Sequence, residues 1–436
     1  MTTEKPSIND NIWNDDIEHK INDEFDIAKK DSHIVEEGVD GKFAWLMVFM
    51  AFMVQFALFG TIGSFGVYLG EYLKTDFKDQ SSTLLSFVGS LGSGMYSFSC
   101  IPAGILVSKV GHRPVMLIGG LLFGLGLVIS SFATQIWLLF IGQSILLGLG
   151  TSFTFIPAIS IVPQWFDKQM GIGVGICTAG SGIGGLIISP VIQAINDTLG
   201  WRWALRINGI FCAFILCGSA LVLKPRVEFK AQRVFDSSIA LDKKFIALWG
   251  QGAVSCFAFW VPFFLMPLYC QYYGISAASA SLMIGLMNGS SALGRVAAGL
   301  VAKYIGNINT LFFNNLICSL TFPLIWYFAT TTWSLIIFSL IFGFLTSALF
   351  TNSALLMPDL FGFEKLAQAN GLFYTCLCPG YLAGTVIASS IIDASTVGDY
   401  TNYLPCMMYC FACFAGSCIF LGWLRVQVSK AWVAKV

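Results

Sequence analysis

Apolar residues are concentrated in twelve long runs along this chain, and the gaps between the runs carry most of the charged residues. A helix that crosses a hydrocarbon layer needs about 20 mostly apolar residues, and each run is close to that length or exceeds it. The runs lie near residues 43–69, 83–107, 115–133, 136–161, 170–195, 203–223, 245–270, 279–303, 309–329, 332–357, 366–391 and 404–425. The pattern therefore predicts an all-α membrane protein with twelve transmembrane helices.

The gap between the sixth and seventh runs is longer than the other gaps and contains six lysines and arginines. It divides the runs into six and six, which predicts two six-helix bundles. The expected parts are an acidic, disordered cytoplasmic tail (1–42), an N-terminal six-helix bundle (43–223), a cytoplasmic linker (224–244), a C-terminal six-helix bundle (245–425) and a short cytoplasmic tail (426–436). Disorder is expected in the first tail because its 12 acidic and 5 basic residues include no long apolar run.

The distribution of lysine and arginine predicts how the bundles are oriented. If both termini are cytoplasmic, the even-numbered gaps and the C-terminal tail hold 14 of these residues, and the odd-numbered gaps hold three. Cytoplasmic loops of membrane proteins carry the excess of positive charge. We therefore expect a multi-pass protein with both ends in the cytoplasm.

Composition agrees with a protein whose main partner is the lipid bilayer. Hydrophobic residues make up 56% of the chain and charged residues 11%, whereas soluble domains are about a quarter charged. The formal net charge is zero and no basic patch is present, so nucleic acid is not an expected partner.

Candidate chemistry for catalysis or metal binding is sparse. The chain has three histidines, and nearly all of its 13 cysteines lie inside apolar runs, where buried reduced thiols are the ordinary state. No acid, base or nucleophile cluster lies at mid-membrane depth. We therefore expect no enzyme activity, no metal and no cofactor. A channel is also not expected, because no ring of charges or filter sequence is visible.

Arg295 is the most informative residue of the chain. It lies eight residues before Lys303, which ends the apolar run 279–303, so in a helix it lies roughly 12 Å below that end and near the bilayer midplane. Charges at that depth face a bundle interior or a water-filled path, and none of the 24 acidic residues lies in the middle of an apolar run to pair with it. A substrate anion is one possible partner; backbone carbonyls of a broken helix are the structural alternative.

Other residues could complete a binding site around Arg295. Asn288 lies seven residues earlier, on the same helix face, although an interhelical hydrogen bond is an equal alternative. The seventh run is aromatic and interrupted by Pro262 and Pro267. Phe259 and Trp260 are its candidate site residues for a planar solute, although most such rings pack against neighbouring helices or lipid.

The two halves of the chain share a short pattern. The second run ends GILVSKVG (104–111) and the eighth ends GLVAKYIG (299–306), so glycines seven apart surround a lysine at the same place in each half. Parallel repeats are typical of transporters whose halves rock about a central site. The candidate gating residues are Gly104, Lys109, Gly111 and Arg113 in the first half, with Pro262 and Pro379 as flexible points.

Four motifs resemble the monocarboxylate transporter-like family of the major facilitator superfamily, and its fungal members in particular. They are DGKFAW (40–45) before the first run, WFDKQ (165–169) before the fifth run, GRVAAG (294–299) in the eighth run and PDLFG (358–362) after the tenth run. The resemblance covers nearly everything from Asp40 to Arg425. It implies the two-bundle fold and transport of an organic solute.

Departures from the family pattern affect proton coupling. Ser108 replaces the usual aspartate of the loop after the second helix. Ser291 stands one turn before Arg295, where proton-coupled members carry an aspartate, and Gly60–Ser64 contains no lysine where those members carry one in the first helix. The resemblance therefore implies an organic solute without supporting proton-coupled lactate transport.

The resemblance also places Thr154, Asn352 and Tyr374 on helices that line the central cavity of superfamily members. The expected solute is a monocarboxylate or a related organic anion, moved by alternating access. A riboflavin-like vitamin taken up by facilitated diffusion and a non-transporting nutrient sensor are the alternatives, and the short stretches outside the runs argue against the sensor. The plasma membrane is the family's usual location, with the vacuolar membrane as the alternative; an accessory subunit is not assigned.

Overall fold

The computed structural model describes residues 39–227, 237–397 and 400–428. The predicted acidic tail lies almost wholly outside the described residues, and so do the middle of the linker and the end of the C-terminal tail.

Each predicted run corresponds to a helix or a helix with a break. In the N-terminal half these are α2 (Lys42–Gly63) with α3 (Phe65–Lys74), α4 (Ser82–Val110), α5 (His112–Ser130), α6 (Ile136–Leu139) with η1 (Phe140–Leu146), α7 (Leu147–Ile161) and η2 (Val162–Trp165), α8 (Met170–Leu199) and α9 (Trp201–Val222).

The C-terminal half repeats the plan after a short helix, α10 (Ser237–Ala240). Its elements are α11 (Lys243–Phe259) with α12 (Val261–Tyr272), α13 (Ala277–Ile305), α14 (Asn307–Thr321) with η3 (Phe322–Trp326), α15 (Thr332–Thr346) with α16 (Ala348–Phe361), α17 (Leu366–Phe373) with η4 (Tyr374–Cys376), α18 (Leu377–Pro379), η5 (Gly380–Gly384) and α19 (Thr385–Ala394), and α20 (Leu404–Val428). A small antiparallel hairpin, β1 (Thr396–Val397) and β2 (Tyr400–Thr401), precedes α20.

Eleven helices in the described part of the chain are long and apolar enough to cross a membrane. The remaining predicted run, the eighth (279–303), corresponds to α13, which is long enough at 29 residues but is not among the eleven. It is the helix that carries Asn288 and Arg295. The long helix that is not counted among the apolar spans is therefore the one that carries the buried arginine.

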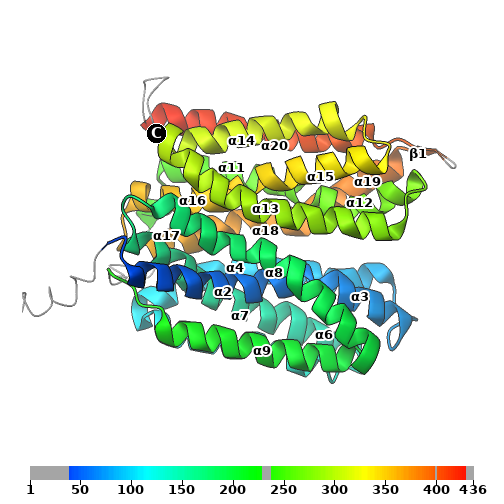
Figure 1. Ribbon diagram of the computed structural model, residues 1–436, viewed down its shortest axis with the longest axis horizontal. Helices are drawn as coiled ribbons and strands as arrows, with labels where there is room; N and C mark the ends of the chain where they lie inside the picture. Colours follow the sequence, from blue (N-terminus) through cyan, green and yellow to red (C-terminus); the bar gives the residue numbers. More distant parts are fainter. Residues whose placement is uncertain (1–38, 228–236, 398–399, 429–436) are drawn as a thin grey trace, which may run out of the picture.

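The two halves form two layers whose helices run along the long axis of the molecule (Figure 1). We call the end at which α2 begins, α9 ends and α11 begins the linker face, and the opposite end the far face. One connected cluster of buried residues includes members of both bundles, whereas a second cluster lies within the C-terminal bundle. The bundles therefore pack against each other directly.

Breaks in the helices occur near the middle of the molecule. The seventh helix breaks at Trp260, two residues before Pro262, because proline has no backbone N–H to continue the hydrogen-bond ladder. The eleventh helix changes to a π-helical turn, Gly380–Gly384, directly after Pro379. The two breaks pack together, since a Cβ atom on Gly380 would lie 2.6 Å from the Cys256 carbonyl carbon of α11. The predicted flexible points Pro262 and Pro379 thus lie at neighbouring breaks.

Glycines of α8 allow close helix packing. A Cβ atom on Gly180 or Gly184 would overlap the backbone carbonyls of Phe52 or Phe56 in α2. On another face of α8, a Cβ on Gly171 would overlap the backbone of Gly299 in α13. Small residues therefore bring α8 against both its own bundle and the opposite one.

Two of the sequence motifs meet at the linker face. Asp40 has a left-handed backbone (φ 61°), and its N–H donates to the carbonyl of Trp165 at 3.1 Å. Its carboxylate accepts from the N–H groups of Lys168 and Gln169, at 3.1 and 3.2 Å, immediately before α8 begins. Such N–H groups have no partner within the helix, so a carboxylate there both caps the helix and complements its dipole. The motif at 40–45 therefore holds the start of α8 in place.

Candidate functional site

Arg295 lies in the middle of α13, on the face that packs against α8 of the other bundle. Its side chain is 8% exposed, and its Nη1 donates to the carbonyl oxygen of Thr178 at 3.1 Å. Arg295 therefore does bind a backbone carbonyl, which was the structural alternative to a substrate anion, but this carbonyl belongs to the opposite bundle. Arg295 consequently connects the two halves of the molecule.

The guanidinium group of Arg295 is only partly satisfied. It lies over the ring of Phe350 in α16, 4.9 Å from the ring centroid, where the negative ring face stabilises a cation. Its Nε is buried and has no hydrogen-bond partner within the part of the chain that the structure describes. No carboxylate lies within ion-pair distance of it among those residues either. A buried donor with a full charge beside it remains available to a ligand.

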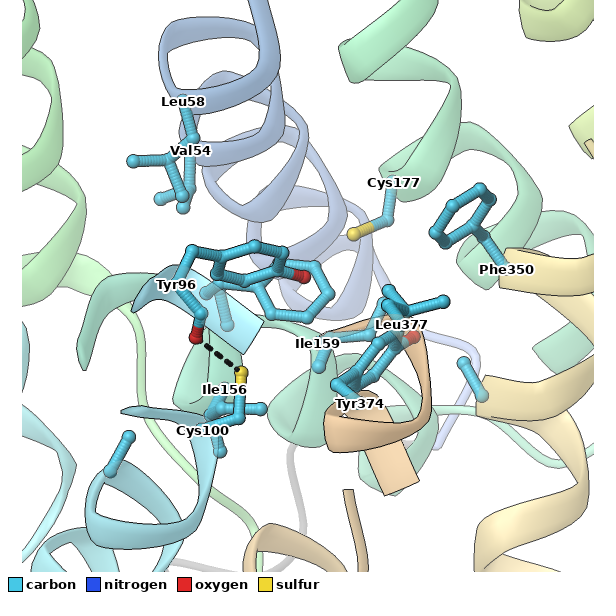
Figure 2. Packing of buried hydrophobic residues seen from close by; sticks show 14 of the residues in the cluster. Val54, Leu58, Tyr96, Cys100, Ile156, Ile159, Cys177, Phe350, Tyr374 and Leu377 are labelled. Carbon is cyan, nitrogen blue, oxygen red and sulfur yellow. Dashed lines mark hydrogen bonds between the residues drawn. The ribbon is translucent and has the colours of Figure 1, made fainter. Parts of the chain in front are cut away.

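Two tyrosines face the same region from different bundles. Tyr96 of α4 and Tyr374 of η4 are each 1% exposed, and neither hydroxyl has a hydrogen-bond partner among the described residues. Both lie within electrostatic range of Arg295, as do Tyr381 and Cys177. Figure 2 shows Tyr96, Cys177, Phe350 and Tyr374 converging on one buried region. The arginine and the two phenols thus supply three unpaired donors to the same buried region between the bundles.

Aromatic rings surround these donors. In the N-terminal bundle, the ring centroid of Phe155 lies 5.6 Å from that of Tyr96 and 4.7 Å from that of Tyr374. In the C-terminal bundle, Trp260 lies 5.9 Å from Tyr381 and 5.2 Å from Phe259. The Trp260 indole N–H is also buried without a partner in the described chain.

Phe259 joins this aromatic wall to Arg295. Its ring packs edge-on against Phe350 at 5.4 Å, and Phe350 lies under the guanidinium. The sequence-predicted residues Arg295, Phe259, Trp260 and Tyr374 are therefore brought together at the interface of the bundles.

The region is sealed on its linker-face side. The hydroxyl groups of Thr178 in α8 and Thr351 in α16 are hydrogen-bonded at 3.0 Å, and Asn370 of α17 donates to Ser160 of α7 at 2.9 Å. Nearer the linker face, a Cβ atom on Gly104 of α4 would lie 2.5 Å from the carbonyl oxygen of Ala367. Polar and backbone contacts thus close the two bundles on this side of Arg295.

The seam between α8 and α13 becomes looser toward the far face. A Cβ on Gly171 would overlap Gly299, and one on Gly175 would lie 2.9 Å from Val296. Beyond Arg295, a Cβ on Gly182 would still lie 2.6 Å from the carbonyl oxygen of Asn288, whereas one on Gly185 would lie 3.6 Å from the side chain of Asn288. The seam is therefore tight from the linker face to just past Arg295 and loosens only nearer the far face, as expected of a conformation closed on the linker-face side.

The other three predicted site residues lie elsewhere or have a different role. Asn288 lies on the α8–α13 seam, and its amide donates to the carbonyl of Ile284 in its own helix at 3.2 Å. Thr154 is fully buried within the N-terminal bundle beside Gly119, and its hydroxyl donates to the carbonyl of Gly150 at 2.8 Å. The structure therefore does not bring Thr154 to the donors around Arg295.

Asn352 is the least explained of the predicted residues. It is 0% exposed, and both polar atoms of its side-chain amide lack partners among the residues described. It follows Thr351, which makes the hydroxyl contact with Thr178. Asn352 therefore lies next to a residue, Thr351, that helps to close the two bundles against each other.

The predicted gating residues divide into two groups. Gly104 lies at a close contact between the bundles, and Pro262 and Pro379 lie at helix breaks. Lys109 and Arg113 are exposed, and Gly111 has the left-handed φ of 85° that ends α4 before α5 begins.

A separate pocket of about 180 Å³ lies at the linker face between α8 and α13. It is lined in part by Lys168 and Lys303 and does not include Arg295.

Sequence reasoning missed three residues of the region. Tyr96, Thr178 and Phe350 are each one residue in a long apolar run, and the run does not reveal which face meets the other bundle. The depth of Tyr96, near the middle of α4, was the available signal.

No group of His, Cys, Asp or Glu that could hold a metal occurs in the described residues.

Comparison with known proteins agrees with this architecture. The family model described as Major Facilitator Superfamily matches residues 44–385. The MFS-type transporter pynF of Aspergillus niger is 26% identical over 90% of this chain and 89% of its own length. Human monocarboxylate transporter 7 is 24% identical, with 85% of each chain covered.

A solved structure shares the fold. The fucose:proton symporter of E. coli superimposes with a TM-score of 0.63 at 17% identity, over 86% of this chain and 98% of that chain. The model match, the relatives and the helix plan agree, so this chain belongs to the Major Facilitator Superfamily, with the monocarboxylate transporter-like, fungal type that its motifs indicate, and it is a multi-pass membrane transporter and not an enzyme.

Proposed function

We propose that this transporter carries a small organic anion, a monocarboxylate or a related acid, and that Arg295 binds the anionic group. The observation that carries the proposal is a buried arginine between the two bundles whose Nε has no partner in the described chain. A charge at mid-membrane depth is costly unless it is paired, and guanidinium N–H groups are well suited to a carboxylate. One relative of the chain is named a monocarboxylate transporter, which supports the same solute class.

Transport would occur by alternating access of this site. The described conformation is sealed by Thr178, Thr351 and the Gly171–Gly299 contact on the linker-face side. Rocking of the bundles would separate α8 from α13 at these glycines and open the site to the linker face. In the orientation that we infer from the positive charges, that face is cytoplasmic.

Proton coupling is not part of the proposal. Ser291, one turn before Arg295, donates its hydroxyl to the carbonyl of Asn288 at 2.8 Å and so offers no carboxylate to carry a proton. We therefore propose a uniporter. A planar vitamin-like solute of the riboflavin type is the second candidate, because the aromatic wall from Phe259 to Tyr381 suits a flat ring system.

The test is a panel of radiolabelled solutes measured in a transporter-deficient host that expresses the wild type or Arg295→Ala. The expected result is transport of one or more organic anions by the wild type, with at least a tenfold lower initial rate in the variant, the scale set by one charge-assisted hydrogen bond. Arg206→Ala is the matched control, since Arg206 is held by Ser131 and the rings of Phe132 and Trp203 near the far face. Equal anion transport by Arg295→Ala would refute the anchor role.

A further inference from the structure

We propose that the substrate is an aromatic organic anion, and that the hydroxyls of Tyr96 and Tyr374 complete its binding site beside Nε of Arg295. This inference rests on the proposed function and narrows it from organic anions in general to those with a ring next to the acid group. It also assigns a role to Tyr96, which no motif of the sequence singles out.

The first step is the state of the three donors. Tyr96 and Tyr374 are 1% exposed and Arg295 is 8% exposed, so none of them can be satisfied by bulk water. Each has a polar atom without a partner in the described chain. Buried polar groups are almost always hydrogen-bonded. Both tyrosines interact electrostatically with Arg295, so we infer that one ligand accepts hydrogen bonds from all three donors.

The second step is the origin of the donors. Tyr96 belongs to α4 of the N-terminal bundle, whereas Tyr374 and Arg295 belong to the C-terminal bundle. Ser97, next to Tyr96, donates to the backbone carbonyl of Tyr374 at 2.6 Å, which fixes the two tyrosines relative to each other. An anion bound by all three donors would therefore be held by both bundles at once.

The third step is the surface around the acid group. Beyond the donors, the walls are rings: Phe155 lies against both tyrosines, and Tyr381 connects Tyr96 to Trp260 with centroid distances of 6.5 and 5.9 Å. Aromatic rings stabilise another ring through offset and edge-to-face contacts. A small hydroxy acid would place its extra hydroxyl against these rings, which are mostly apolar surface.

The experiment compares acids that differ only in aromaticity. The purified full chain, reconstituted in lipid nanodiscs, is titrated with benzoate, cyclohexanecarboxylate and lactate, with benzyl alcohol as the uncharged ring. Binding is followed by tryptophan fluorescence and by the shift of the thermal unfolding midpoint. We expect benzoate to bind at least tenfold more tightly than the other three, and Arg295→Ala to abolish the difference.

Conservative variants test the two phenols. Tyr96→Phe and Tyr374→Phe keep the rings and remove the hydroxyls, and each is expected to weaken benzoate binding roughly tenfold, the scale of a hydrogen bond to a charged group. Tyr269→Phe is the matched control, because its hydroxyl lies in a separate cluster, 3.5 Å from the carbonyl of Trp326. The unfolding midpoint without ligand shows whether each variant is folded.

The outcomes separate this inference from the proposed function. Equal, Arg295-dependent binding of lactate or cyclohexanecarboxylate would overturn the aromatic class and leave the anion transporter standing. Unchanged benzoate affinity in both tyrosine variants would remove the phenols from the site. If no acid binds in an Arg295-dependent manner, the inference and the proposed function both fail.

Discussion

At the scale of single residues, the arrangement of Arg295 explains why an arginine and not a lysine occupies this position. The planar guanidinium lies over the ring of Phe350, donates through Nη1 to Thr178 and keeps Nε free, so its separate N–H groups serve two purposes. An ammonium group is a compact charge on a flexible stem and has no such fixed fork. The geometry, in addition to the charge, is therefore expected to determine binding.

Arg295→Lys tests this point. It keeps one positive charge at the same depth but cannot hold the contact with Thr178 and present a directed donor at the position of Nε. We expect the initial rate of anion transport to fall at least tenfold in proteoliposomes, at an equal amount of reconstituted protein. A rate within twofold of the wild type would mean that only the charge matters.

At the scale of elements, Asp40 connects the start of α2 to the start of α8. Its carboxylate accepts from Lys168 and Gln169, and the ring of Phe43 packs edge-on against Trp165 at 5.1 Å. The indole N–H of Trp165 donates to the carbonyl of Lys224 at 2.8 Å, where the linker begins. Three segments that are distant in the sequence thus share one set of contacts at the linker face.

Asp40→Ala removes both carboxylate contacts and places alanine at a left-handed φ of 61°. We expect a loss of about 1–2 kcal/mol from the cap, and a further cost of about 1 kcal/mol from the backbone. Asp40→Asn should lose less, because asparagine tolerates this conformation and retains one acceptor oxygen. The measurement is the thermal unfolding midpoint in detergent.

Asp79→Ala provides the comparison for that measurement, because Asp79 is an exposed acid near the far face. Its midpoint should stay at the wild-type value. If Asp40→Ala has the same unfolding midpoint as Asp79→Ala, the capping role of Asp40 is contradicted.

The contact between α8 and α13 at the linker face allows a second prediction at this scale. Gly171→Ala would place a methyl group against the backbone of Gly299, so the closed linker face should be destabilised. We expect faster amide hydrogen exchange at residues 170–178 and 366–373, because the seal there opens more often. Gly285→Ala is the matched control, since its nearest neighbour would be Leu186 at 4.0 Å. Unchanged exchange in Gly171→Ala would show that the seam adapts without opening.

The helices could be predicted from the sequence because burial in lipid requires long apolar runs, and those runs are visible without any tertiary information. Their breaks and contacts could be predicted only in part. Pro262 marks the break at Trp260, but nothing local marks the break at Ser64 between α2 and α3.

The site shows the same limit. Arg295 stands out by its charge, whereas Tyr96 and Thr178 owe their positions to which helix face meets the other bundle. That choice depends on packing between segments far apart in the chain, so a single apolar run does not reveal it.

At the scale of the whole molecule, the proposed uniport of an anion has an electrical consequence. A uniporter that moves one monovalent anion moves one net negative charge, whereas symport of the anion with one proton is electroneutral. Moving one elementary charge across a membrane potential is worth about 2.3 kcal/mol per 100 mV, which corresponds to a roughly 50-fold concentration ratio at equilibrium. An interior-negative potential would therefore drive the anion outward through the proposed uniporter.

Proteoliposomes with an imposed potassium diffusion potential test this directly. With a negative interior, the wild type should release preloaded radiolabelled anion faster than at zero potential, and a positive interior should drive uptake. An imposed pH gradient at zero potential should change neither direction, because Ser291 cannot carry a proton between the two sides. Uptake that follows the pH gradient and ignores the potential would establish proton symport. An acidic group elsewhere in the chain would then have to act as the proton carrier.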